Sequence, residues 1–135
     1  MKTPHDIVSL MLLEDAYSRW LGLDLLEISA GSCLLECRME SEMLNGFQRV
    51  HGGITYALSD SAMAFAANAH GYKCYSIETS ISHTARVELG DVLKVQCQEI
   101  HRGKTLALYE VKVENQDGRL VAHFKGTVHI SGEGW

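Results

Sequence analysis

The segment from about Gly53 to His70 is apolar on most sides of a helix. Its apolar positions are Ile54, Ala57, Leu58, Ala62, Met63, Phe65 and Ala66. A helix that is apolar all round is buried, because it has no broad face suited to water. The rest of the chain must therefore enclose this helix, and Gly71 is a suitable residue to end it.

The segments on either side of the helix alternate between apolar and polar residues, which is typical of strands with one wet face. Before the helix, Leu26, Ile28 and Ala30 alternate ahead of Gly31, and Cys33, Leu35, Cys37 and Met39 alternate after it. Four more alternating segments follow at 75–87, 91–101, 105–115 and 119–130. Because the links between these four are short and rich in turn residues, we expect consecutive strands to be antiparallel neighbours.

The N-terminus has the residues of a helix start. Thr3 can cap, Pro4 suits the first helical position, and Asp6 lies near the positive end of the helix dipole. We expect one helix from here to a stop at Gly22. The order of elements predicts a single α+β domain over residues 1–135, with about six strands curled around the central helix, a mostly polar outer side, and the N-terminal helix at an end or edge.

Composition excludes several classes of protein. The net charge of −5 gives no reason to expect nucleic acid or an anionic membrane as a partner. No apolar run approaches the roughly 20 residues that cross a bilayer, and the N-terminus is a poor signal peptide. Cys33 and Cys37 lie about 13 Å apart along a strand, too far for a disulfide or a shared zinc. We expect a cytoplasmic protein with reduced cysteines and no metal.

Two features of the central helix can serve chemistry. Gly52 and Gly53 at its start allow close approach to free N–H groups that suit a polarised carbonyl oxygen, although two glycines also make an ordinary tight turn. Asp60 is a carboxylate in an apolar helix, where burial is costly. It is either a general base or nucleophile for an acyl carbon, or a residue bonded to the hydroxyl of Ser59 or Ser61.

The spacing of these groups predicts a dimer. Gly52 and Asp60 are eight residues apart, which is about 12 Å along a helix. An Asp side chain cannot bridge that distance, so both groups can act on one carbonyl only if Asp60 comes from a second copy of the chain. Two such helices would run antiparallel across a two-fold axis.

The stretch "HGGITYALSD" resembles the H-G-G-x-x-x-x-L-x-D pattern of hotdog-fold thioesterases of the phenylacetate-pathway (PaaI-like) type. The flanks "MLNG" and "AFAANAHG" are similar too, and the likeness covers nearly the entire chain. It implies a long helix wrapped by a five- or six-stranded antiparallel sheet. It also implies homodimers joined edge to edge, dimers that pair into tetramers, and an acyl-CoA thioesterase with no cofactor beyond the coenzyme A of its substrate.

The same resemblance implies roles for five residues. The Gly52 N–H would bind the thioester carbonyl oxygen, and His51 would orient it. Asn45 would contact the acyl or water side, and the partner's Asp60 would attack the carbonyl or activate water. Ser76 would lie close to Asp60. Each side chain also has a structural alternative: His51 as a cap, Asn45 as a turn residue tolerant of the left-handed conformation, Ser76 as a strand-edge hydroxyl.

The contacts with coenzyme A are the part of the resemblance that transfers least. After the third strand many relatives have an aromatic-Leu-Arg-Pro run, whereas residues 82–91 here are "SHTARVELGD", with no Pro. Gly53, Arg86, Arg102 and Lys104 are candidate contacts with the cofactor part of the substrate. The three cations are equally well explained as solvated surface charges.

Two other functions stay open. A hotdog hydratase or dehydratase would pair His51 with Asp60 for proton transfer, and a non-catalytic protein would bind acyl-CoA without hydrolysis. The chain has no GxSxG motif, so a serine triad of that kind is not indicated. The sequence does not identify the acyl group. An aromatic group such as phenylacetyl or hydroxylated benzoyl and a medium chain are both open, with Tyr56, Met63 and Phe65 expected in the pocket floor.

Overall fold

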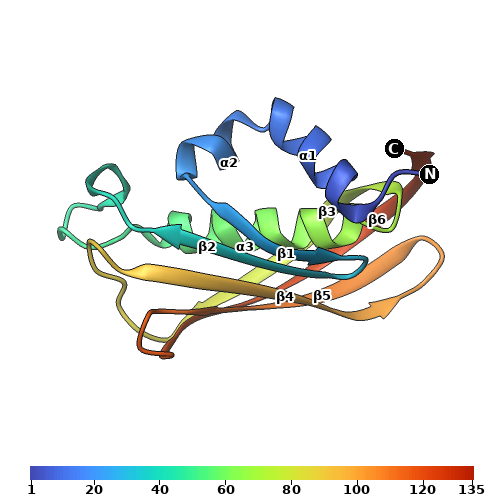
Figure 1. The fold of residues 1–135 in the computed structure, drawn as a ribbon. Coiled ribbons are helices and arrows are strands. Elements are labelled where there is room, and N and C mark those ends of the chain that lie inside the picture. Colours follow the sequence, from blue (N-terminus) through green and yellow to red (C-terminus); the bar gives the residue numbers. More distant parts are fainter.

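The computed structural model describes all 135 residues and shows one sheet with a long helix on its inner face (Figure 1). The elements in chain order are α1 (Pro4–Glu14), α2 (Ala16–Leu21), β1 (Asp24–Ser29), β2 (Ser32–Arg38), the short 3-10 helix η1 (Ser41–Met43), α3 (Gly52–Asn68), β3 (Tyr72–His83), β4 (Val92–Arg102), β5 (Leu106–Glu114) and β6 (Leu120–Gly134). The predicted α+β class and the central helix are confirmed.

The six strands form one antiparallel sheet in the order β1-β2-β4-β5-β6-β3. Consecutive strands are neighbours within β1–β2, β4–β5 and β5–β6, as predicted. The prediction is wrong for β3 and β4, because β3 pairs with β6 at the far edge of the sheet. The link between them does not make a tight turn: the Val87 carbonyl accepts from Val50 N–H (3.0 Å), and the Asp91 carbonyl accepts from Met39 N–H (2.8 Å). These bonds hold residues 84–91 beside the loop that precedes α3.

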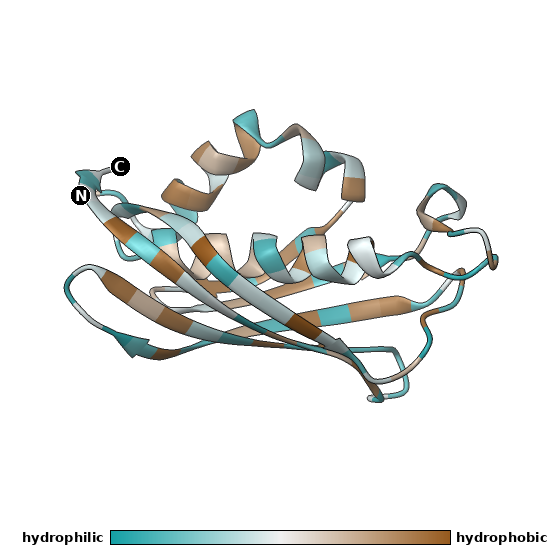
Figure 2. Ribbon diagram, turned by 180° about the vertical axis from the view of Figure 1, so that it is seen from behind, coloured by the Kyte–Doolittle hydropathy of each residue, from teal (hydrophilic) through white to brown (hydrophobic).

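The core lies between α3 and the sheet, and brown and teal alternate along the strands as they do in a half-buried sheet (Figure 2). Leu58, Met63 and Phe65 of α3 are fully buried against it. Gly126 on β6 permits this close packing, since a Cβ there would overlap the Met63 side chain. One stripe of α3 stays open, with Gly53 and Tyr56 exposed and Asp60 half-buried.

The N-terminal helix differs from the prediction, because it is two helices and not one. Thr3 and Asp6 form the predicted capping box of α1, and Gly22 ends α2 in the left-handed conformation with φ 71°. Between them Asp15 leaves the helical conformation (φ −91°, ψ 79°), and its carboxylate caps α2 by accepting from Ser18 N–H at 3.0 Å. Helices α1 and α2 pack on the flank of α3, and α1 also contacts the edge strand β1.

The pattern of buried and exposed residues in strand β1 differs from the expected alternation. A β-bulge between Leu25 and Glu27 shifts the register, so Leu26, which was expected to face inward, is 45% exposed. Strand β2 alternates as predicted, and all four cysteines are buried and free.

Substitution of Gly126 tests the packing of α3 on the sheet. We expect Gly126→Val to lower the free energy of unfolding by about 1–3 kcal/mol, because the added side chain must displace Met63. Urea unfolding of Gly126→Val and of Gly126→Val in a Met63→Ala background checks this. The loss should be smaller in the second background, since the two sites are in contact. Equal losses in both backgrounds would contradict the packing explanation.

Candidate active site

The start of α3 has one free backbone donor. His51 caps the helix: its Nδ1 accepts from Gly53 N–H at 2.8 Å, and its carbonyl accepts from Ile54 N–H at 2.9 Å. The His51 N–H itself donates to the Met43 carbonyl at 2.8 Å, which fixes the loop. The Gly52 N–H has no partner within the protein. Gly52, and not Gly53, is therefore the residue whose amide is available to a ligand.

The ring of His83 lies against Gly52. A Cβ at Gly52 would stand only 3.2 Å from His83 Nε2, so the absence of a side chain lets the imidazole approach the helix start. Thr55 lies beside both groups: its hydroxyl donates to the Gly52 carbonyl at 3.0 Å and lies 3.4 Å from His83 Nδ1. No periodicity or motif in the sequence points to His83, which is distant from Gly52 in the chain and belongs to the stretch that departs from the family pattern.

Asp60 has no hydrogen-bond partner in the protein, although it is half-buried. The hydroxyls that flank it are bonded elsewhere: Ser59 donates to the Thr55 carbonyl at 2.8 Å, and Ser61 pairs with Ser18 at 2.8 Å. Burial raises the pKa of the Asp60 carboxyl above its usual range, and the nearby Asp15 carboxylate adds to the shift. The structural alternative for Asp60, a bond to a neighbouring hydroxyl, does not occur.

Asn45 and Ser76 occupy different settings. The Asn45 Oδ1 accepts from the N–H groups of Phe47 (2.9 Å) and Arg49 (3.2 Å), so this oxygen holds a turn while the side-chain amide stays free. The left-handed residue of that turn is Gln48 (φ 61°), not Asn45. Ser76 is exposed on β3, opposite Val128 of β6.

The candidate cations lie at two ends of the molecule. Arg86 is exposed in the link 84–91, near the start of α3. Arg102 and Lys104 lie around the β4–β5 turn, where Arg102 is half-buried and its Nη1 stands 3.8 Å from Glu99 Oε1. Glu99 also binds His70 Nε2 at 2.9 Å, just beyond the end of α3. The 17 residues of α3 separate the two ends by about 25 Å within one subunit.

An apolar cavity of about 370 Å³ borders the start of α3. Its walls are formed by Tyr17, Trp20, Glu42, Met43, Leu44, His51, Gly53 and Ile54. The rings of Tyr17 and Trp20 stack with their centroids 5.9 Å apart. The expected pocket floor is wrong for Met63 and Phe65, which are fully buried in the core and do not reach this cavity. Tyr56 is half-exposed and its hydroxyl bonds to Thr79 of β3.

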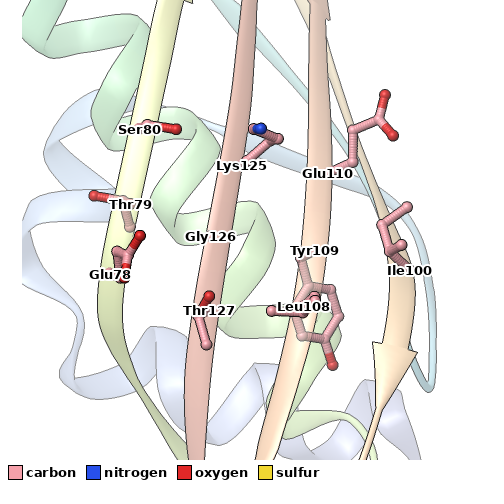
Figure 3. Close-up of a pocket in the computed structure, with 10 residues that line it drawn as sticks. All are labelled: Glu78, Thr79, Ser80, Ile100, Leu108, Tyr109, Glu110, Lys125, Gly126 and Thr127. Atoms are coloured by element: carbon pink, nitrogen blue, oxygen red, sulfur yellow. The ribbon is translucent and has the colours of Figure 1, made fainter.

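A second depression, of about 360 Å³, lies on the outer face of the sheet across β3, β6, β5 and β4 (Figure 3). In this view α3 passes behind the strands, so the sheet separates the depression from the start of the helix. Ile100 and Leu108 line it and are 58% and 42% exposed, which makes the outer face less polar than predicted. None of the sequence-predicted site residues lines it.

No three side chains of His, Cys, Asp or Glu are grouped as ligands of a metal ion. None of the helices combines the length and the apolar character that crossing a membrane requires.

Comparison with known proteins identifies the family of this arrangement. The family model of the thioesterase superfamily matches residues 47–122, which is more than half of the chain. The chain belongs to the thioesterase superfamily. The acyl-coenzyme A thioesterase PaaI of Escherichia coli (strain K12) is 32% identical over 122 residues, covering 90% of this chain and 87% of that protein. Acyl-coenzyme A thioesterase 13 of Homo sapiens is 28% identical over 130 residues, covering 93% of each.

The solved structures agree with the sequence comparison. The structure of the E. coli PaaI protein from the phenylacetic acid degradation operon matches with a TM-score of 0.94 at 30% identity, covering 97% of this chain and 95% of that one. A Thermus thermophilus protein matches with a TM-score of 0.83 at 30% identity, covering 86% and 97%. The predicted hotdog fold and PaaI-like type are confirmed, and this thioesterase-superfamily chain is an enzyme of the thioester hydrolase class.

The setting of Asp60 predicts a gain of stability when its charge is removed. A raised pKa in the folded state means that ionisation disfavours folding, so wild-type stability falls as the pH rises from about 3.8 through the folded-state pKa. We expect Asp60→Asn to unfold at higher urea than wild type at pH 7, with the difference shrinking toward pH 3.5. Asp117→Asn, in an exposed turn, is the matched control and should leave the urea midpoint unchanged.

Proposed function

We propose that this enzyme hydrolyses the thioester of an aryl or medium-chain acyl-CoA, consuming one water and releasing the free acid and coenzyme A. The proposal depends chiefly on the single free amide at the start of α3, Gly52 N–H, in the same helix as the unbonded, half-buried carboxylate of Asp60. An amide at a helix N-terminus stabilises the negative charge that develops on a carbonyl oxygen. The E. coli and human relatives are both named acyl-coenzyme A thioesterases, which supports acyl-CoA as the substrate class.

The enzyme works as a homodimer in this proposal. Gly52 and Asp60 remain about 12 Å apart along α3, so one chain cannot bring both to a carbonyl. The open stripe of α3 is continuous with the free edge of β3, since Tyr56 is bonded to Thr79. That edge leaves backbone groups unpaired and exposes Tyr75 and Ile77, which favours pairing with a second copy. A two-fold axis there runs the two α3 helices antiparallel and brings Asp60 of one copy toward Gly52 of the other.

The reaction then divides between two copies. Gly52 N–H polarises the carbonyl, and the partner's Asp60 either attacks the carbon or removes a proton from the attacking water. The coenzyme A thiolate leaves without needing a general acid. His51 holds the helix start in place, Asn45 offers its free amide to the acyl or water side, and Ser76 lies on the edge strand that meets the partner.

Substrate contacts follow from the same dimer. Arg86 lies at the helix start of one copy, and antiparallel helices bring the partner's β4–β5 turn, with Lys104 and Arg102, toward that end. We assign the phosphates of coenzyme A to these cations, with Arg102 the least available because it is engaged with Glu99. Gly53 gives the substrate room beside the helix. The apolar cavity with its stacked Tyr17 and Trp20 suits an aryl or alkyl group.

The proposal also includes the pairing of two dimers and the compartment of the cell. The apolar residues Ile100, Leu106 and Leu108 on the outer face of the sheet suit pairing of two dimers. Four free, buried cysteines favour a reducing compartment such as the cytoplasm.

A hydratase mechanism is less well supported, because the His51 Nδ1 that would move a proton already accepts from Gly53 N–H.

The substrate is tested by a thiol-release assay across aryl and alkyl esters of coenzyme A. We expect release with at least one class, and loss of at least 10³-fold in kcat for Asp60→Asn, because the base or nucleophile is gone. Hydration of an enoyl-CoA without thiol release would favour the hydratase. Tight binding across the panel without turnover would favour the non-catalytic protein.

Removal of the Gly52 amide gives a second test. Proline suits the first helical position and His51 has the extended conformation (φ −61°, ψ 137°) that precedes proline, so Gly52→Pro deletes the N–H while the helix can still begin there. We expect a loss of about 10²-fold or more in kcat. Gly52→Ala, which adds the same contact with His83 but keeps the N–H, is the control, and the loss for Gly52→Pro beyond the loss for Gly52→Ala measures the amide.

Mixed dimers test whether the site is shared. Chains with Gly52→Pro and chains with Asp60→Asn are each inactive alone, but a dimer of one of each has one complete site. Refolding an equal mixture should restore up to about a quarter of wild-type activity, since half of the dimers are mixed and each has one working site of two. A mixture as inactive as its components would mean that the site is not divided between copies.

A further inference from the structure

The helix start offers one amide where two donors are usual. Oxyanion sites for acyl transfer generally use more than one hydrogen-bond donor. Here the Gly53 N–H is taken by His51 Nδ1 at 2.8 Å, and the Ile54 N–H by the His51 carbonyl at 2.9 Å. Only the Gly52 N–H is free, so a second donor must come from a side chain.

His83 is the side chain placed to supply it. Its Nε2 stands 3.2 Å from the position that a Cβ of Gly52 would occupy, and no protein group bonds to this nitrogen. The ring is held by its strand: His83 pairs with Ala122 of β6, and the next residue, Thr84, donates its N–H and its hydroxyl to the carbonyls of Val121 (3.0 Å) and Leu120 (2.7 Å). These bonds fix the backbone on which the imidazole stands.

Thr55 can set the hydrogen position on the ring. Its hydroxyl lies 3.0 Å from the Gly52 carbonyl and 3.4 Å from His83 Nδ1, so its single hydrogen can turn toward either. When it donates to Nδ1, a neutral imidazole has its own hydrogen on Nε2, which faces Gly52. A neutral ring can therefore donate beside the free amide, without a positive charge next to the positive end of α3.

We infer that His83 is a second hydrogen-bond donor to the thioester carbonyl oxygen, acting beside the Gly52 N–H and oriented by Thr55. This inference depends on the proposed thioesterase function and adds a catalytic group to its site. The bond strengthens as charge develops on the oxygen, so it acts on kcat more than on substrate binding. It also gives a reason for glycine at position 52 beyond the helix start, since the ring must come close to the amide.

Substitution of His83 tests its role as a hydrogen-bond donor while the volume of the side chain is largely kept. His83→Phe keeps a ring but has no hydrogen-bonding atom, and His83→Gln keeps an N–H donor. We expect His83→Phe to lower kcat by about 10²-fold with KM changed by less than about 3-fold, and His83→Gln to retain more activity. His129→Phe is the control and should keep wild-type kcat, because His129 is exposed and lies on β6 opposite Tyr75, distant from the Ala122 that pairs with His83.

Variants of Thr55 test the orientation of the ring. Thr55→Val keeps the volume but loses the hydroxyl, and we expect a smaller fall in kcat than for His83→Phe. Thr55→Ser keeps the hydroxyl and should retain more activity than Thr55→Val. In the double variant His83→Phe with Thr55→Val, the losses should not multiply, because Thr55 acts through the same ring.

The outcomes separate this inference from the function itself. If wild type releases no thiol from any ester, the proposed function fails. If wild type is active and His83→Phe keeps kcat within about 2-fold, the function stands and the role of His83 is wrong. Equal losses for Phe and Gln, with a raised KM and a lower thermal midpoint, would mean that His83 only supports the structure and would also overturn the inference.

Discussion

The packing of α3 against the sheet is the constraint on which the rest of the molecule depends. Sheet residues of β2, β4, β5 and β6 bury most of the helix, and Gly126 removes the side chain that would hold it away from β6. Since α1 and α2 cover one flank, the only stripe left open includes Gly53, Tyr56 and Asp60. The candidate catalytic groups are thus confined to one line along the helix, beside an unpaired strand edge.

The open stripe of α3 lowers the stability of the folded protein at Asp60. The Asp60 carboxylate is half-buried without a hydrogen bond, and its pKa is raised because water is partly excluded and Asp15 lies nearby. A structural carboxylate in the same position would be bonded to Ser59 or Ser61, yet both hydroxyls are directed elsewhere. Such an arrangement is common where a group must stay reactive, because a fully satisfied carboxylate is a weaker base or nucleophile.

The sequence predicted the parts of this molecule that follow from local pattern. The buried helix, the alternation of β2, and the capping box of Thr3 and Asp6 were all visible as spacing, and H-G-G-x-x-x-x-L-x-D identified the family. The sequence did not show that β3 crosses to the far edge, because short links usually join neighbours. Strand β3 ends at His83, so the link to β4 is longer than expected, and it is bonded to residues before α3 through Val87 and Asp91. The break at Asp15 was missed because a side-chain cap leaves the apolar spacing of a helix unchanged. The bulge was missed because Leu25 and Leu26 are both apolar, so the sequence does not show which of them faces inward. His83 was missed as a site residue because nothing in a linear pattern relates it to Gly52.

The pairing of β3 with β6 has a consequence for the order in which the protein folds during synthesis. His83 stands opposite Ala122, and Tyr72 opposite Gly134, so the edge strand has no partner until the C-terminal strand exists. A chain still being synthesised can form α3 and the β1–β2 hairpin, but it cannot position the imidazole at the helix start. The close approach of His83 to Gly52 at the start of α3 is therefore a late, long-range event in folding, because it needs β6 to be in place.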